Sequence, residues 1–143
     1  MRSRRLIASV VLCMLAAVPG GAQTAKSLLV TVPFQFSVHD QVLPAGAYMI
    51  SQVGPGGQPV FAVQSSDDGT AVYALGIATS RNGGSTPGSV AFHRHGNSYF
   101  LADIWWGGGF ISGIDVCESK TEKELAKTAS LRRPDQVVLL ASR

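Results

Sequence analysis

Apolar residues occur along the chain as short runs that are separated by clusters of turn-forming residues. In the first run, 27–38, apolar and polar positions alternate with a period of two on both sides of Pro33, a pattern typical of strands with one buried face. Pro33 has no amide hydrogen to donate to a sheet, so it indicates a bend or an edge. The same signals predict six further strands, at 47–53, 60–64, 70–79, 90–94, 99–106 and 137–141.

Segments rich in glycine and proline separate these strands. In the first of them, Pro44 fixes its own φ, and Gly46 is expected to take a backbone conformation that other residues resist. The stretch 107–113 (GGGFISG) is predicted to be a flexible break in the chain. The remaining turn and loop segments are 39–46, 54–59, 65–69 and 81–88.

The clearest hairpin joins 90–94 to 99–106 through Gly96 and Asn97, which tolerate positive φ. Pairing Arg94 with Tyr99 assigns the side chains to two faces. One face then holds Val90, Phe92, Leu101 and Trp105, and the other holds Ala91, His93, Phe100, Ile104 and Trp106. Both faces are largely apolar, so this hairpin is predicted to lie centrally.

A single helix is predicted near the C-terminus. Ser119 can cap its first turn, and Glu122, three residues later, completes a capping box. Leu125 and Ala129 form only a thin apolar stripe, which predicts weak packing on the sheet. About seven strands and one late helix indicate a mostly β fold, a small antiparallel sandwich or barrel that occupies 23–143 as a single domain.

The N-terminus has the order of a secretory signal peptide. A basic start precedes the uncharged apolar stretch 6–18, and Gly20 and Ala22 supply the small side chains that the peptidase needs. Cleavage is expected between Ala22 and Gln23, so that 1–22 is removed and the mature chain works in the periplasm or outside the cell. The stretch is shorter than the roughly 20 residues of a transmembrane helix, and no transmembrane segment is expected after cleavage. The basic residues are Arg2, Arg4 and Arg5.

Removal of the signal changes the charge of the chain. Three of the 12 basic residues leave with it, so nine basic residues remain against nine acidic ones and the formal net charge is zero. Nucleic-acid-binding domains carry a basic excess, and none survives here. Cys13 also leaves, so Cys117 is alone and cannot form an internal disulfide. Burial is the expected state of this thiol.

Four segments together resemble a group of small secreted proteins that are numerous in soil acidobacteria and their relatives. They are VPFQFSV at 32–38, LPAGAYMI at 43–50, FHRHGNSYFLADIW at 92–105 and ESKTEKELAK at 118–127. The chain departs from the group's pattern at His95, where tyrosine is common, and in its glycine-rich stretch 106–109. The resemblance implies a secreted β-rich domain and brings no catalytic residues with it.

His93 and His95 are the most interesting candidates for chemistry. They lie two apart on one predicted strand, so both side chains leave the same face. This spacing occurs in zinc and copper sites, which require a third ligand. His39 is the only other histidine, and Asp103 is expected on the opposite face. The simpler interpretation is one half-buried histidine and one polar histidine near a turn.

Other candidates are weaker. Tyr99, Trp105 and Trp106 suggest a stacking platform, but alternation separates the two tryptophans and favours core packing. The GGGFISG stretch lacks the Gly-Lys-Ser/Thr ending of a phosphate loop and does not match the Gly-x-Ser-x-Gly of a nucleophile elbow. Asp103 is the only acid inside a predicted strand, so no facing pair of carboxylates is expected.

The sequence therefore predicts no catalytic residue, no cofactor and no assigned metal ligand. The leading hypothesis is a secreted, non-enzymatic β domain that binds an unknown protein or envelope component, with no nucleic-acid partner. Two alternatives stay open. One is a periplasmic metal-binding protein that uses His93 and His95, and the other is a small hydrolase whose site is assembled from separated loops.

Overall fold

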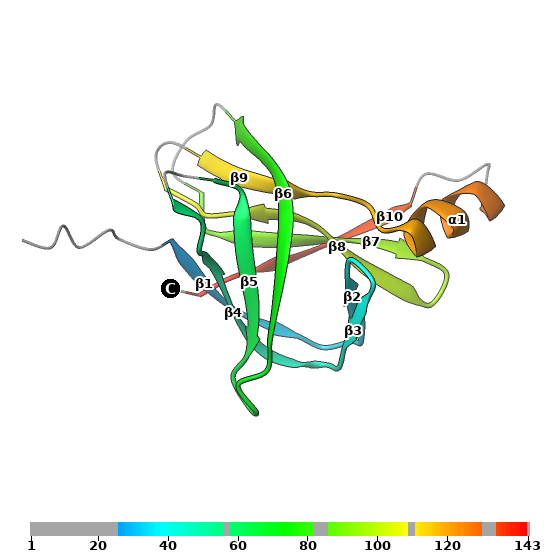
Figure 1. Ribbon diagram of the computed structural model, residues 1–143, viewed down its shortest axis with the longest axis horizontal. Coiled ribbons are helices and arrows are strands. Elements are labelled where there is room, and N and C mark those ends of the chain that lie inside the picture. The colour runs from blue at the N-terminus through cyan, green and yellow to red at the C-terminus, as the bar shows by residue number, and fades with distance from the viewer. Residues whose placement is uncertain (1–25, 56–57, 82–85, 109–110, 130–133, 143) are drawn as a thin grey trace, which may run out of the picture.

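The structure is a computed structural model that describes residues 26–55, 58–81, 86–108, 111–129 and 134–142 (Figure 1). The predicted signal peptide lies outside these residues. Within them the chain forms ten strands and one helix, which confirms the prediction of a mostly β fold with one short helix near the C-terminus. The strands are β1 (Ser27–Val32), β2 (Phe36–Val38), β3 (Gln41–Leu43), β4 (Gly46–Gln52), β5 (Val60–Ser65), β6 (Ala71–Arg81), β7 (Ser89–His95), β8 (Ser98–Trp105), β9 (Ile111–Val116) and β10 (Asp135–Leu140), and the helix is α1 (Lys120–Thr128).

The strands curl into one barrel-like sheet. From β1 the order of neighbours is β1-β4-β5-β6-β9-β8, after which β8 pairs with β7 and β7 with β10. Just beyond β10, Ser142 exchanges two backbone hydrogen bonds with Leu29 of β1, at 3.0 and 2.9 Å. The two ends of the strand order therefore meet, as the neighbouring positions of β1 and β10 in Figure 1 show.

A small hairpin of β2 and β3 is attached to this sheet. The chain leaves β1 at Val32, as the break at Pro33 predicted, and β2 then pairs with β8 in parallel at Ser37 and Phe100. The predicted turn over 39–46 is wrong, because β3 lies inside it. A two-residue turn at His39, whose φ is 51°, and the following Asp40 already reverses the chain.

Tyr48 connects the end of this hairpin to β4. Its hydroxyl donates to the carbonyl oxygen of Pro44 at 2.6 Å, and its ring packs edge-on against Phe36 at 5.1 Å between centroids. Burial raises the pKa of the Tyr48 hydroxyl, and the charges of nearby Asp68 and Asp67 add to the effect. The special conformation predicted for Gly46 is wrong. Its φ is not positive, and a Cβ there would meet nothing closer than 3.4 Å.

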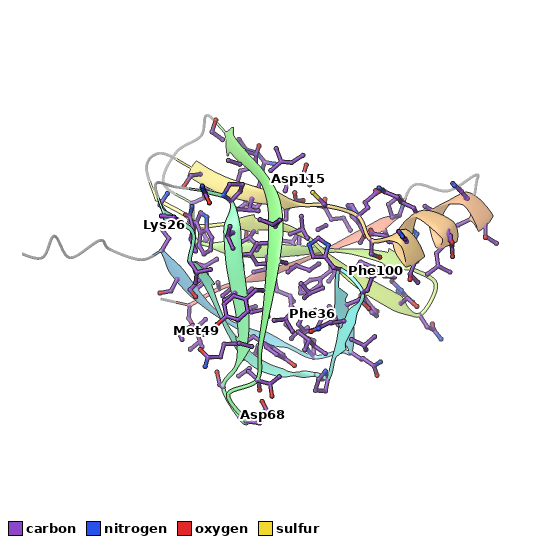
Figure 2. The ribbon with its side chains drawn as sticks, viewed as in Figure 1. Lys26, Phe36, Met49, Asp68, Phe100 and Asp115 are labelled. Carbon is purple, nitrogen blue, oxygen red and sulfur yellow. The ribbon has the colours of Figure 1, made fainter. Side chains whose placement is uncertain are left out.

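The interior is filled by alternate residues from strands on every side. Leu28, Val30 and Val32 of β1 are all buried, which confirms the period-two pattern of the first run. Phe36 also points inward, with its ring 5.3 Å from that of Phe92 (Figure 2). Full burial of side chains of this size contributes about 1.5–3 kcal/mol each. The largest side chains that are completely enclosed are Tyr48, Phe61, Phe92, Ile50, Ile104 and Ile114.

A bulge in the β7–β8 hairpin changes the predicted faces of its second strand. The pairing follows the prediction as far as Phe92 and Leu101, but Ala91 then pairs with Asp103 and leaves Ala102 as an extra residue. One extra residue moves every later side chain to the other face of a strand. The predicted faces of residues 103–106 are therefore wrong.

The consequences of this bulge are visible in the burial of four residues. Ile104 and Trp106 point into the core, where they are 0% and 5% exposed. Asp103 and Trp105 are half-buried on the outer face instead, which is the face of His93. The hairpin has strands on both sides, β10 next to β7 and β9 next to β8, which confirms its predicted central position.

Strand β9 occupies part of the stretch that was predicted to be a flexible break. Gly107 and Gly108, with φ of 75° and 105°, turn the chain, but Gly113 lies inside a regular strand. A Cβ on Gly113 would lie 2.7 Å from Cε3 of Trp105, because the indole packs directly on this backbone. The glycine therefore permits close approach rather than flexibility.

Two further predictions concern the surface. Among the residues described, no helix is long and apolar enough to span a bilayer. Cys117 was expected to be buried, and this is wrong, since its side chain is exposed. It follows the inward-pointing Val116 at the end of β9, where alternation directs the next side chain outward.

Candidate functional site

His93 and His95 lie near the end of β7, and both side chains are on the outer face of the sheet, as their spacing predicted. Their ring centroids are 6.4 Å apart. The side chain of His95 is only 7% exposed and packs edge-on against Phe100, whereas that of His93 is 28% exposed. The pair is therefore enclosed on the side of His95 and open on the side of His93.

A third side chain that could bind a metal comes from α1, which lies beside the end of β7 (Figure 1). The side chain of Glu122 is 5% exposed, and its Oε1 is 3.0 Å from His93 Nδ1 and 3.7 Å from His95 Nε2. The three potential ligand atoms all lie within 4.8 Å of one another. His39, which the sequence also offered, belongs to the β2–β3 turn and is not a member of this cluster.

Capping of α1 positions this carboxylate. Ser119 is buried, and its Oγ accepts a hydrogen bond from the backbone N–H of Glu122 at 3.0 Å, which confirms the predicted N-cap. The capping box would return the Glu122 carboxylate to the backbone of Ser119. Instead the carboxylate lies against His93 and His95, so the glutamate joins the helix to the sheet.

The two distances from Glu122 Oε1 suit a small transition-metal ion. Zinc lies about 2.0–2.2 Å from histidine nitrogen and carboxylate oxygen, so two ligands in a tetrahedral site are about 3.3 Å apart. The two distances from Glu122 Oε1, 3.0 and 3.7 Å, bracket that value. Two imidazoles and one carboxylate are ligands for zinc, copper and similar ions, whereas calcium and magnesium prefer oxygen alone.

A second polar group adjoins the histidines on the same face. Asp103 Oδ2 accepts a hydrogen bond from Gln136 Nε2 at 3.3 Å, and Gln136 is the residue of β10 directly opposite His93. Burial raises the pKa of the Asp103 carboxyl, and Asp115, opposite it on β9, raises it further, while the charges of His93 and Arg81 act in the other direction. The sequence predicted neither this carboxylate pair nor the proximity of Asp103 to His93.

The aromatic residues do not form a stacking platform. Trp105 and Trp106 lie on opposite faces, as alternation predicted. The ring of Trp105 packs on Gly113, and the guanidinium of Arg81 lies 4.4 Å from its centroid. The ring of Tyr99 stacks on Phe34 at 3.9 Å. These rings are therefore engaged in packing within the domain.

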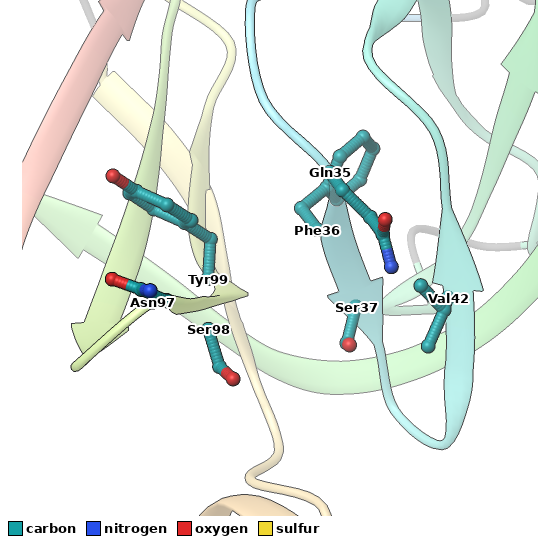
Figure 3. A pocket seen from close by; sticks show the side chains of 7 residues that line it. All are labelled: Gln35, Phe36, Ser37, Val42, Asn97, Ser98 and Tyr99. Atoms are coloured by element: carbon teal, nitrogen blue, oxygen red, sulfur yellow. The ribbon is translucent and has the colours of Figure 1, made fainter.

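A shallow groove of about 240 Å³ lies between the β2–β3 hairpin and the start of β8 (Figure 3). Its lining combines amides, hydroxyls and three larger side chains, and it includes no acid, histidine or cysteine. It offers hydrogen bonds but neither metal ligands nor the groups of acid–base catalysis. The lining residues are Gln35, Phe36, Ser37, Val42, Asn97, Ser98 and Tyr99.

An apolar row follows the outer face of β6. Tyr73, Leu75 and Ile77 alternate along this strand and are 68%, 61% and 62% exposed. On the neighbouring strand β5, Val60 lies opposite Leu75 and Ala62 lies opposite Tyr73. A contiguous exposed row of large apolar side chains is typical of an interaction surface.

No family model, curated protein or solved structure matches this chain. The site is therefore interpreted from its own geometry. Sequence reasoning found two of its three members, His93 and His95, and missed Glu122. A signal was available, because Glu122 lies on the face of the helix that carries Leu125 and Ala129, the face predicted to pack on the sheet.

Proposed function

We propose that this chain is a secreted, periplasmic or extracellular β domain that binds a divalent transition metal, with zinc as the first candidate. The ligands are His93 Nδ1, His95 Nε2 and Glu122 Oε1. The observation that carries the proposal is the convergence of these three atoms from β7 and α1, with Glu122 Oε1 at 3.0 and 3.7 Å from the two nitrogens and all three atoms within 4.8 Å of one another.

Burial supports binding in preference to catalysis at this site. Two of the three ligand side chains are less than a tenth exposed, and only His93 faces solvent. Three protein ligands leave one coordination position, which a water molecule can fill from the side of His93. Such an arrangement can hold and release an ion, but it presents little open surface to a larger substrate.

The direct test is zinc titration of the mature chain, residues 23–143, by isothermal calorimetry and by native mass spectrometry. We expect one zinc per chain in the wild type. His93→Ala should lower the zinc affinity at least about tenfold. Loss of a residue that only orients a metal ligand costs about that much, and loss of the ligand itself should cost more. His39→Asn is the matched control, because His39 lies outside the cluster and asparagine tolerates the positive φ at this position. A wild type that binds no zinc and no copper would overturn the proposal.

A second candidate function is contact with an envelope component through the apolar row of Tyr73, Leu75 and Ile77. The test is co-sedimentation of the mature chain with vesicles of phosphatidylethanolamine and phosphatidylglycerol. Leu75→Lys should reduce the bound fraction severalfold if the row makes the contact, since a charge there has to be removed from water. Equal sedimentation of the wild type with and without vesicles would exclude a lipid surface as the component.

A further inference from the structure

The helix α1 is attached to the sheet in an unusual way. Glu122 is its one buried residue, and Leu125, the large apolar side chain of its predicted packing stripe, is 36% exposed. Isolated helices shorter than about 12 residues are marginal in water, so a helix of nine residues depends on its packing. In α1 that packing is made mainly by a carboxylate.

A buried carboxylate is costly unless opposite charge or hydrogen bonds compensate it. In the described structure the Glu122 side chain contacts His93 and His95, at 3.0 and 3.7 Å. A divalent cation bound between the three groups compensates the carboxylate, since it brings the largest local charge in such a site. Attachment of α1 and occupancy of the site are thus coupled through one side chain.

The ligands also divide between two parts of the fold. His93 and His95 belong to β7, whose place between β8 and β10 holds them in the sheet. Glu122 belongs to α1, which contacts β7. A metal bound by all three joins the helix to a rigid strand, and metal-binding free energy becomes free energy of docking.

We infer that metal binding fastens α1 to the outer face of β7, so that the helix is docked when the site is loaded and undocks readily when it is empty. This inference rests on the proposed metal-binding function. Undocking removes Glu122 from His95 and so opens the outer face of β7 where the His95 ring packs on Phe100, which Figure 2 labels.

The test is hydrogen–deuterium exchange of the mature chain, followed by mass spectrometry, with zinc and with EDTA. If only the docked form binds the ion, zinc at 100 times its Kd should slow exchange of the amides of 120–128 up to about 100-fold. Peptides from β5 and β6 should change little and serve as the internal reference. Glu122→Gln keeps the shape of the side chain and should abolish the zinc-dependent protection of α1, whereas His39→Asn should retain it.

The possible outcomes distinguish failure of the docking inference from failure of the proposed metal binding. If calorimetry on the same sample shows zinc bound to the wild type while exchange in 120–128 is unchanged, the docking inference is overturned and metal binding stands. If the wild type binds no metal, both are overturned. If Glu122→Gln shows the same zinc-dependent protection as the wild type, the carboxylate is not the group that joins metal and helix, and the inference fails.

Discussion

Gln136 of β10 donates a hydrogen bond to Asp103 of β8 across the intervening strand β7, with 3.3 Å between Nε2 and Oδ2. The contact joins three neighbouring strands on the face that carries His93. It is possible only because the bulge at Ala102 moves Asp103 to this face. The same displacement sets Asp103 directly opposite Asp115 of β9, and two like charges then face each other.

The first prediction concerns this pair of aspartates. Burial, and then Asp115, raises the pKa of Asp103 above its ordinary value of 3.8, so the folded protein holds this proton to higher pH than the unfolded chain does. The contribution of Asp103 to the free energy of unfolding is therefore present at low pH and is lost as the pH rises above about 4. Asp115→Asn should raise the free energy of unfolding at pH 7 by about 0.2–1 kcal/mol, measured in urea. A gain of the same size at pH 3, where the raised pKa of Asp103 keeps that carboxyl protonated, would show that charge repulsion is not the cause.

The second prediction concerns the packing of Trp105 on Gly113. A methyl group at 113 would lie 2.7 Å from the Ile104 carbonyl oxygen and 2.7 Å from the indole. Gly113→Ala should therefore lower the free energy of unfolding by about 1–3 kcal/mol, as overpacking does. Gly46→Ala is the control, because a Cβ there has room and should cost less than about 1 kcal/mol. Equal losses in the two variants would contradict the assigned role of Gly113.

A third prediction follows from the hydroxyl of Tyr48. Tyr48→Phe removes its 2.6 Å hydrogen bond to Pro44 and should cost about 0.5–1.5 kcal/mol at pH 7. Because burial raises the pKa of this hydroxyl, the folded chain keeps the proton when the unfolded chain has lost it, and stability falls as the pH rises above 10. In Tyr48→Phe the free energy of unfolding, measured in urea, should therefore fall less between pH 9 and 11 than in the wild type. Parallel curves for the two proteins would refute the linkage.

Zinc should also change global stability. At 100 times its Kd the ion should raise the free energy of unfolding of the mature chain by about 2.7 kcal/mol, provided that the unfolded chain does not bind it. EDTA should reverse the gain. His93→Ala should abolish it, and His39→Asn should leave it intact. A zinc-dependent gain of equal size in His93→Ala would assign the ion to another site.

The exposed thiol of Cys117 gives a simple check on the register of β9 and the link to α1. The native mature chain should react with one equivalent of Ellman's reagent at a rate within about tenfold of a free thiol, since no burial protects it. The denatured chain supplies the reference for full reaction. A thiol that reacts only after denaturant is added would show that Cys117 points inward.

Much of the fold follows from alternation along the chain, and the failures have identifiable causes. The alternation of Leu28, Val30 and Val32 predicts their burial, because every second side chain of a regular strand points to the same face. One extra residue at Ala102 defeats the same logic for 103–106, and nothing in the local composition marks it. Strand β9 was missed because Gly113 resembles a loop residue, whereas its partner Trp105 is the reason for the glycine.

The candidate site likewise combines residues that local spacing predicts with one that depends on the tertiary fold. His93 and His95 could be paired from their spacing, since both lie on one strand. The helix face that Glu122 shares with Leu125 and Ala129 indicated that it would lie toward the sheet, but a capping box and a metal ligand can use the same residue at the same helical position, so the sequence did not assign its role. Only the placement of α1 against β7 decides between them. Long-range placement of this kind depends on the whole sheet and not on any segment.

The bridge between Leu29 and Ser142 joins positions 113 residues apart. Backbone pairing on the outer edge of β1 therefore depends on Ser142, through this one bridge. Folds dominated by such distant pairings form slowly, since the loop must close before the contact can stabilise it. A chain with this connectivity remains open while its C-terminal strand is missing, and truncation by a few residues at that end should leave β1 as an exposed edge ready to pair with another molecule.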